Sequence, residues 1–232
     1  MRWADLDSLN HVNNVVYLDY AAESRAMLVE DGLLANRPVR RVAVDFLRPL
    51  LLSRRPVHIT STVAGDELVQ EIRPRIDAAP FARVVTTFGE PEPLPAAPSY
   101  ADPLACRVRR SDLGSDGMVT PVKVFELFQE ARILFISNRL ASMSAGRFVV
   151  GRVDVTYGDG IPWRREPYEV VSWVSRLGTS SATFEAEIIG DGTVHARATA
   201  VLIGFDLETQ RSRPYTSEER EAFAELSQPG SP

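Results

Sequence analysis

The sequence predicts an α+β fold of two tandem units, each a long helix wrapped by a curved antiparallel sheet. The first observation behind this prediction is an internal repeat: residues 2–25 align with residues 109–132 without a gap, and eight of the 24 pairs are identical. Unrelated segments of this length share about one or two identities, so the chain contains a duplication. The second observation is that one helical pattern and four strand patterns follow in the same order in each half.

Each repeat opens with a helix. In the first repeat, Asn13 or Asn14 can cap a helix that runs from about Asn14 to Asp31, and Gly32 can end it in a left-handed conformation. A period of 3.6 residues places one set of side chains on a single face. In the two repeats these sets are Tyr17, Tyr20, Ala21, Ser24, Met27 and Leu28, and Val124, Leu127, Phe128, Ala131, Leu134 and Phe135. Each helix is therefore expected to cover a sheet with this face.

Segments rich in Val, Ile, Thr and Phe follow each helix, and Pro, Gly or charged turns separate them. This pattern is typical of antiparallel strands. We expect strands at 39–48, 56–64, 67–76 and 81–88 in the first unit, and at 148–157, 167–177, 180–190 and 193–206 in the second. A short terminal helix is expected from Thr216 to Leu226, with Thr216 or Ser217 as its cap.

A proline-rich segment divides the chain. Five prolines lie within residues 91–103, where they remove backbone donors from a stretch with few apolar residues, so we expect a linker there. The predicted domains are a first unit over 1–90, this linker, and a second unit over 104–232 that carries the terminal helix.

Composition excludes several classes of protein. A net charge of −5 and a pI near 5.3 disfavour a nucleic-acid-binding surface. No apolar run approaches the roughly 20 residues of a membrane span, and the N-terminus lacks a signal peptide, so we expect a cytoplasmic protein. Cys106 is the only cysteine, which excludes an intrachain disulfide and a Cys-rich metal site. His11, His58 and His195 lie in separate predicted elements, so we expect no metal and no other cofactor.

One motif carries a family resemblance. The first repeat reads Asp5-x-Asp7-x-x-Asn10-His11-Val12-Asn13-Asn14-x-x-Tyr17. This string resembles the opening of hotdog-fold acyl-CoA thioesterases of the 4-hydroxybenzoyl-CoA thioesterase-like group, which typically reads D-x-D-x-x-G-H-V-N-N-x-x-Y. The resemblance covers about residues 2–90 and, more weakly, 107–215. It implies a double hotdog protein, in which one chain forms a pseudo-dimer that imitates the homodimer of single-hotdog relatives. Those relatives begin with a strand before the motif, so a first edge strand is expected to be very short or to lie upstream.

The resemblance implies a catalytic carboxylate and an oxyanion donor. Thioester hydrolysis needs a group that attacks the acyl carbon or activates water, and a donor for the developing oxyanion. Carried over from the family, the nucleophile or general base is Asp7 and the donor is the backbone N–H of Asn14. A loop aspartate can also simply satisfy turn N–H groups. His11 could orient Asp7, contact substrate, act as a base, or bond the loop backbone.

Two further residues of the motif are candidates for binding substrate. They are Asn13 and Tyr17, although a helix cap suits Asn13 better and a packing role suits Tyr17 better. Glu23 and Glu130, each followed two residues later by Arg, are expected to form helix-surface or interface ion pairs; a catalytic helix Glu is a minor alternative.

The second repeat lacks the chemical groups of the first. Gly114 stands at the position of Asp7, Met118 at that of His11, and Pro121, which has no N–H, at that of Asn14. Asp116 lies two positions away and is expected to face a different direction. We therefore expect one active site per chain, on the first repeat, with the second contributing packing and a wall of the acyl or CoA channel.

The predicted function is hydrolysis of an acyl-CoA substrate. Two alternatives are weighed: a hotdog enoyl-thioester hydratase or dehydratase, although its expected D-x-N-P-L-H motif is absent, and a non-catalytic acyl-thioester binding protein, since one repeat is already degenerate. The sequence leaves open the acyl group, the choice between CoA and acyl-carrier protein, and any further homo-oligomer.

Overall fold

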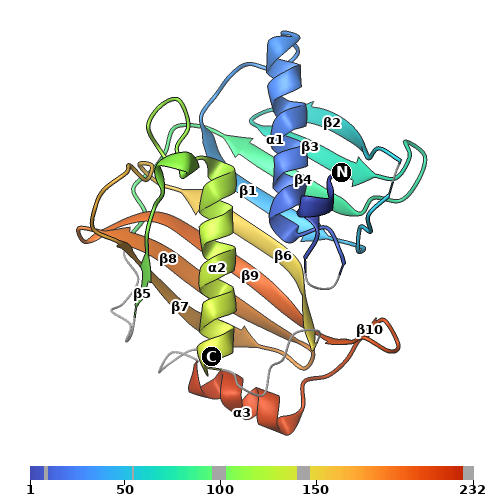
Figure 1. Cartoon of the computed structure of the whole chain (residues 1–232), viewed down its shortest axis with the longest axis vertical. Helices are drawn as coiled ribbons and strands as arrows, with labels where there is room; N and C mark the ends of the chain where they lie inside the picture. Colours follow the sequence, from blue (N-terminus) through green and yellow to red (C-terminus); the bar gives the residue numbers. More distant parts are fainter. Residues whose placement is uncertain (8–9, 54, 96–102, 140–146, 227–232) are drawn as a thin grey trace. The chain divides into compact units, whose positions relative to one another are not determined.

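The computed structural model describes residues 1–7, 10–53, 55–95, 103–139 and 147–226 (Figure 1). Within this part the chain divides into two compact units, Met1–Pro91 and Glu92–Pro232. The predicted linker over 91–103 falls largely on residues 96–102, which lie outside the described part.

The first unit is a long helix on a four-stranded antiparallel sheet. Helix α1 spans Asn14–Glu30, and the strands are β1 (Val39–Phe46), β2 (His58–Ala64), β3 (Glu67–Arg73) and β4 (Ala82–Phe88), in the spatial order β2-β3-β4-β1. All four strands lie within three residues of their expected bounds. A short 3-10 helix, η1 (Trp3–Asp5), precedes α1.

Both ends of α1 follow their sequence signals. The Oδ1 atom of Asn13 accepts the N–H of Val15 at 3.0 Å, so Asn13 is the cap. Gly32 follows the helix with φ of 70°, a left-handed value that costs glycine little.

The predicted helix faces are only partly right. The buried residues of α1 are Val15, Tyr17, Leu18 and Ala21, whereas Met27 is 56% exposed. Gln70 of β3 donates a hydrogen bond to the carbonyl oxygen of Ala21 at 3.0 Å, and no residue of α1 beyond Ala21 is buried. The sheet therefore covers only the first half of α1, and periodicity alone does not show where that cover stops.

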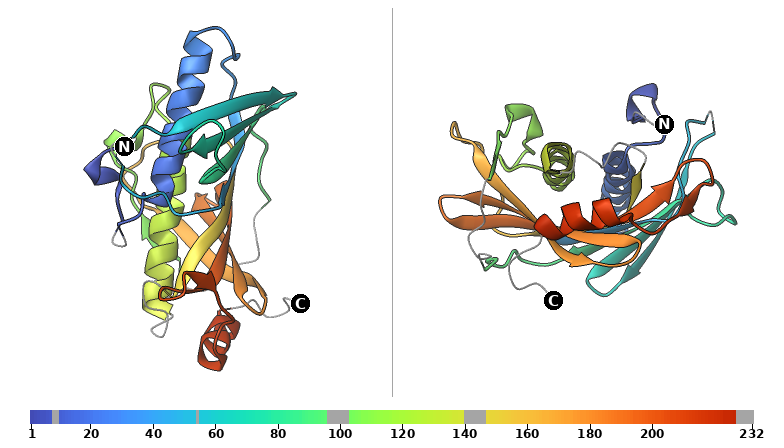
Figure 2. Two further views of the ribbon diagram at one scale, coloured as in Figure 1. Left: turned by 90° about the vertical axis from the view of Figure 1, so that its right-hand side faces the viewer. Right: turned by 90° about the horizontal axis from the view of Figure 1, so that it is seen from below.

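The second unit repeats this plan with longer strands. Helix α2 (Pro121–Arg139) packs on β5 (Leu104–Cys106), β6 (Phe148–Tyr157), β7 (Tyr168–Leu177), β8 (Ser181–Gly190) and β9 (Thr193–Asp206), which are ordered β6-β9-β8-β7-β5 and joined antiparallel. Strand β10 (Arg211–Ser212) pairs with β9. Figure 2 shows α2 lying against one face of the sheet of its own unit. Strands β5 and β10 were not predicted from the sequence, because strands of three and two residues are too short to show alternation.

The buried face of α2 also differs from the face that the sequence predicted. Val124, Phe128 and Ala131 are buried as expected, whereas Leu134 is 47% exposed and Phe125 and Ile136 are buried instead. Since the expected stripe and the buried stripe differ by about one residue, the helix is rotated slightly relative to the prediction. None of the described helices is long and apolar enough to cross a membrane.

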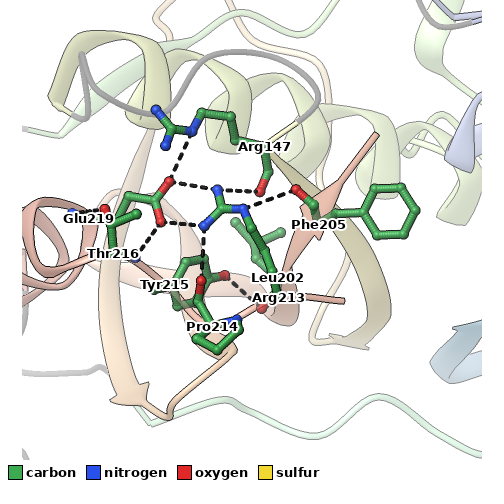
Figure 3. A network of polar contacts seen from close by, with 8 residues as sticks. All are labelled: Arg147, Leu202, Phe205, Arg213, Pro214, Tyr215, Thr216 and Glu219. Atoms are coloured by element: carbon green, nitrogen blue, oxygen red, sulfur yellow. Dashed lines mark hydrogen bonds and ion pairs between the residues drawn. The ribbon is translucent and has the colours of Figure 1, made fainter. Parts of the chain in front are cut away.

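The terminal helix α3 (Ser217–Glu225) is joined to the sheet by a buried ionic network (Figure 3). Glu219 is 1% exposed and accepts two hydrogen bonds from Arg213, at 2.7 and 2.8 Å, while Arg147 lies 3.1 Å away. Thr216 and Glu219 form a capping box. The hydrogen bonds from Arg213 hold the pKa of Glu219 below its usual value.

This network predicts that Glu219→Gln lowers stability at pH 7 by about 2 kcal/mol, within the range of hydrogen bonds to charged groups. Gln keeps the shape and the capping acceptor of Glu219 and loses the charge that pairs with Arg213 and Arg147. The midpoint of urea unfolding measures the loss, and Glu221→Gln, on an exposed position of the same helix, is the matched control.

The same substitution predicts a pH dependence. Because the folded pKa of Glu219 is lowered, its stabilising contribution is present above the unfolded pKa, about 4.3, and is lost as pH falls through the lower folded pKa. The difference in stability between the wild type and Glu219→Gln should therefore shrink below about pH 4. A difference that stays constant between pH 7 and pH 3 contradicts the role of the charge.

Candidate active site

The two motif segments fold into loops with the same backbone hydrogen bonds. We name them the Asp7 loop (residues 5–13, of which 8–9 lie outside the described part) and the Gly114 loop (residues 112–120). In the Asp7 loop, the N–H of Asp7 donates to the carbonyl oxygen of His11 at 2.8 Å; in the Gly114 loop, Gly114 donates to Met118, also at 2.8 Å. The duplication seen in sequence thus extends to the backbone.

Further bonds match in the same way. The N–H of the residue eight positions after the first Asp donates back to it in both loops, from Asn13 to Asp5 at 2.8 Å and from Thr120 to Asp112 at 3.0 Å. Isolated β-bridges also match, since Leu6 pairs with Val12 and Leu113 pairs with Val119. In their described residues the two loops therefore share these backbone contacts and differ in side chains.

The turn inside each loop needs a left-handed residue. Asn10 has φ of 58° and its counterpart Gly117 has φ of 77°. Asn is one of the few residues other than Gly that adopts this conformation at low cost. Asn10, where the resembling family usually has Gly, therefore preserves the turn.

The carboxylate of Asp7 is hydrogen-bonded within the loop that leads into α1. Its Oδ1 atom accepts the N–H of His11 at 3.0 Å, and the side chain is half-buried. Burial raises the pKa of Tyr17 to about 12, the hydrogen bond from the N–H of Leu50 partly offsets this, and the negative charge of Asp7 raises it further. Asp7 and the Tyr17 hydroxyl are thus close enough to interact.

His11 contacts Asp7 through its backbone. Its imidazole makes no hydrogen bond to any residue in the part of the chain that the structure describes. Of the roles considered for His11, a ring hydrogen bond that orients Asp7 is therefore not present, while contact with substrate stays a prediction.

The N-terminal turn of α1 presents a backbone donor. The N–H of Val15 bonds the side chain of Asn13, and the N–H of Val16 bonds the carbonyl oxygen of Asn13 at 3.0 Å. The N–H of Asn14 makes no hydrogen bond to another described residue. First-turn N–H groups have no partner within their helix and lie at the positive end of its dipole. The N–H of Asn14 is therefore not used within the described part of the chain, and its role as an oxyanion donor stays a prediction.

Asn13 and Tyr17 are both engaged within the protein. The Asn13 side chain caps α1, and Tyr17 is 3% exposed with its hydroxyl accepting the N–H of Leu50 at 3.1 Å. Their roles as substrate-binding residues stay predictions.

The expected orientation of Asp116 is wrong. Its Oδ1 atom accepts the N–H of Met118 at 3.0 Å, the same bond that Asp7 makes with His11. A Cβ atom added to Gly114 would lie 3.1 Å from this oxygen, so the Asp116 carboxylate occupies the space that a side chain at position 114 would enter. The physical reason is that the turn N–H needs an acceptor, and the absence of a side chain at Gly114 leaves room for one from two residues away.

The helix start differs more clearly between the units. Pro121 is the first residue of α2, where its missing N–H and fixed φ are well tolerated, and Thr120 takes the cap position with its Oγ1 atom 3.4 Å from the N–H of Lys123. At the position of the Asn14 donor, the second unit has none.

An apolar groove that was not predicted from the sequence lies along the segment that is bonded to the Asp7 loop. Its cavity volume is about 510 Å³. Its lining comprises Met1, residues 49–53 and 55–57, and, from the turn between β3 and β4, Pro74, Arg75, Ala78 and Phe81. The run Leu50-Leu51-Leu52, which lies outside every expected strand, was the available signal. Three consecutive leucines in a connecting segment are unusual unless they meet a partner or a ligand.

Other reactive groups do not extend this site. Burial and the charge of Asp112 raise the pKa of the Cys106 thiol to about 11, which disfavours a nucleophilic thiolate. Among the described residues, no group of three or more His, Cys, Asp or Glu side chains could hold a metal ion.

Two family models match the chain. The model described as the thioesterase-like superfamily matches residues 109–223, and the model described as the acyl-ACP thioesterase C-terminal domain matches residues 1–71. These matches fall on the second and the first unit, respectively. No curated protein sequence matches the chain.

Solved structures share the fold. A Lactobacillus plantarum protein assigned as an oleoyl thioesterase aligns with 89% of this chain and 94% of its own, with a TM-score of 0.64 and 14% identity. A predicted thioesterase from Bacillus stearothermophilus aligns with 55% of this chain and 98% of its own, with a TM-score of 0.50 and 24% identity. A thioesterase superfamily protein from Jannaschia sp. CCS1 aligns with 58% and 99%, with a TM-score of 0.51 and 16% identity.

Proposed function

Because the chain belongs to the thioesterase-like superfamily, we propose that it hydrolyses acyl-CoA thioesters at one active site, built on the Asp7 loop of the first unit. We further propose that the two units are tandem hotdog units. Each has a long helix against an antiparallel sheet and a motif loop at the helix start.

One observation carries the placement of the active site. The Asp7 loop and the Gly114 loop share their backbone hydrogen bonds, yet only the first has a helix that begins with a backbone donor, at Asn14 instead of Pro121. The Asp7 loop also carries a carboxylate two residues after its first Asp, at Asp7, where the Gly114 loop has Gly114. The second unit keeps a turn-bonding carboxylate, Asp116, on an exposed position. The comparison supports hydrolysis in the first unit.

The proposed reaction adds water across the acyl C–S bond. The Asp7 carboxylate attacks the acyl carbon or takes a proton from the attacking water, and the Asn14 N–H donates to the oxygen that becomes negative. If Asp7 acts as a base, water adds to the acyl carbon, the C–S bond then breaks, and the thiol leaves with the proton that Asp7 took from the water. If Asp7 acts as the nucleophile, the thiolate leaves as a mixed anhydride forms between the acyl group and Asp7. Water then hydrolyses this anhydride, which restores the Asp7 carboxylate and supplies the proton of the thiol. The products are a carboxylic acid and a thiol. His11 supports Asp7 by donating its backbone N–H to Oδ1.

The thiol that carries the acyl group could be CoA or acyl-carrier protein. The family resemblance of the motif favours CoA, whereas the family model over residues 1–71 describes an acyl-ACP thioesterase domain. A net charge of −5 disfavours docking of an acidic carrier protein, so CoA is the proposed carrier.

The proposal predicts thiol release from acyl-CoA by the purified chain. A panel of short, long and aromatic acyl-CoAs, followed by reaction of the free thiol with a chromogenic disulfide, measures kcat/KM for each. The same acyl groups on acyl-carrier protein test the carrier, and enoyl-CoA hydration, followed by loss of its ultraviolet absorbance, tests the hydratase alternative. Binding of acyl-CoA without release of thiol from any substrate contradicts the proposal in favour of a binding protein.

A further inference from the structure

The apolar groove of the first unit is open to solvent and rich in leucine. Its walls include Leu50, Leu51, Leu52, Val57, Ala78 and Phe81. Leu51 is 57% exposed and Leu52 is 46% exposed, so two consecutive large apolar side chains are partly open to solvent. Contiguous exposed apolar surface of this kind marks a binding site more often than a solvated surface.

One wall of the groove is bonded directly to the Asp7 loop. Leu51 forms a β-bridge with His11, and the N–H of Val12 donates to the carbonyl oxygen of Leu50 at 2.8 Å. The N–H of Leu50 in turn donates to the Tyr17 hydroxyl. These backbone bonds fix the position of this wall relative to the loop that carries Asp7.

The corresponding segment of the second unit carries two aromatic side chains. Met118 forms a β-bridge with Pro162, as His11 does with Leu51. The next residue, Trp163, lies under the guanidinium of Arg110 at 3.8 Å. Tyr168, at the position of Val57, is 1% exposed and donates from its hydroxyl to the carbonyl oxygen of Pro162 at 2.7 Å. A buried tyrosine of the second unit thus stands where Val57 lines the groove of the first unit.

We propose that the groove binds the hydrocarbon tail of a medium- or long-chain aliphatic acyl group while its thioester carbonyl lies at the Asp7 loop. The inference rests on the proposed function. The volume of about 510 Å³ is within the range of sites for whole small-molecule ligands and far larger than an acyl group of two to four carbons fills. Burial of the tail holds the carbonyl in place and so contributes to catalysis as well as to binding.

The test narrows the groove and measures the acyl-length profile. Ala78→Phe adds a ring to the wall, and the expected result is a loss of about tenfold or more in kcat/KM for dodecanoyl-CoA, comparable to one misplaced methylene in an apolar pocket, with butanoyl-CoA changed by less than about twofold. Leu52→Trp is a second narrowing variant on an exposed position, in case Ala78→Phe fails to fold. Ile76→Phe, in the same turn but 70% exposed and outside the groove lining, is the matched control and should leave the profile unchanged.

A binding measurement separates this inference from the proposed function. A dodecyl-CoA thioether, which cannot be hydrolysed, is titrated by calorimetry into the wild type and into Ala78→Phe. Suppose the chain binds the thioether tightly, Ala78→Phe weakens this binding about tenfold, and the chain hydrolyses no thioester. This result supports the groove as the site of the acyl tail and rejects the proposed function. Hydrolysis whose length profile is the same in the wild type, Ala78→Phe and Leu52→Trp overturns the groove and leaves the proposed function standing.

Discussion

Asp7→Asn should lower kcat for acyl-CoA hydrolysis by a factor of about 10² to 10⁴, the range that a positioned general base contributes. Asn keeps an oxygen at Oδ1, which can still accept the N–H of His11, so the fold of the loop should persist. The substitution removes the negative charge that attacks the acyl carbon or takes the proton from water. Steady-state thiol release at saturating substrate measures the loss, and circular dichroism with thermal unfolding shows that the variant is folded.

Asp116→Asn is the matched control for this experiment. Asp116 makes the same bond to a turn N–H at the same distance, 3.0 Å, in the loop without a helix-start donor. If Asp7 mattered only as a turn acceptor, the two substitutions would have equal effects on stability and neither would act on kcat specifically. We expect Asp116→Asn to keep activity within about twofold, since exposed substitutions of this kind change little. A large loss with Asp116→Asn and a small one with Asp7→Asn would move the active site to the second unit.

Asn14→Pro should lower kcat by a factor of about 10² to 10³, the cost of removing one oxyanion donor. Proline removes the backbone N–H that the proposal uses, together with the side-chain amide of Asn14, and it is favoured at the first position of a helix. The preceding Asn13 has φ of −59° and ψ of 142°, which a residue before proline readily adopts. The second unit already accommodates proline at this position, because Pro121 begins α2.

Asn14→Ala separates the backbone donor from the side chain. This variant keeps the N–H and removes the amide, so its activity should stay close to that of the wild type, with a KM that also changes little. Equal losses in Asn14→Pro and Asn14→Ala would show that the side chain acts, and would reject the backbone of residue 14 as the oxyanion donor. Unchanged turnover in both variants would reject any role for this position.

Local signals in the sequence predicted the helices and strands of each unit closely. Asn13 caps α1 because a side-chain oxygen at that position reaches the N–H two residues on, and Gly32 follows it in a left-handed conformation. Strands β6, β8 and β9 begin and end within a residue of their expected bounds, since their alternation is long and turns flank them. Strand β5 was not predicted, because its three residues are too few to show an alternating pattern.

Contacts between distant segments account for what the sequence did not predict. The buried faces of α1 and α2 are displaced from the expected stripes because burial depends on how far each sheet extends along its helix. Asp116 accepts the turn N–H of Met118 from an unexpected position, because Gly114 has no side chain and leaves space there. An alignment of the two repeats residue by residue does not show this space. The groove arises where the leucines of one connection meet a turn more than 20 residues later.

The sequence by itself determined the duplication, the order of elements in each unit, and the loss of a helix-start donor at Pro121, because each of these is a property of residue identity and spacing. Only the tertiary structure decided that both loops keep the same hydrogen bonds, that a displaced carboxylate replaces Asp7 as the turn acceptor, and that the groove adjoins the Asp7 loop. The physical reason is that hydrogen bonds and cavities depend on which surfaces meet, and a linear sequence does not specify that directly.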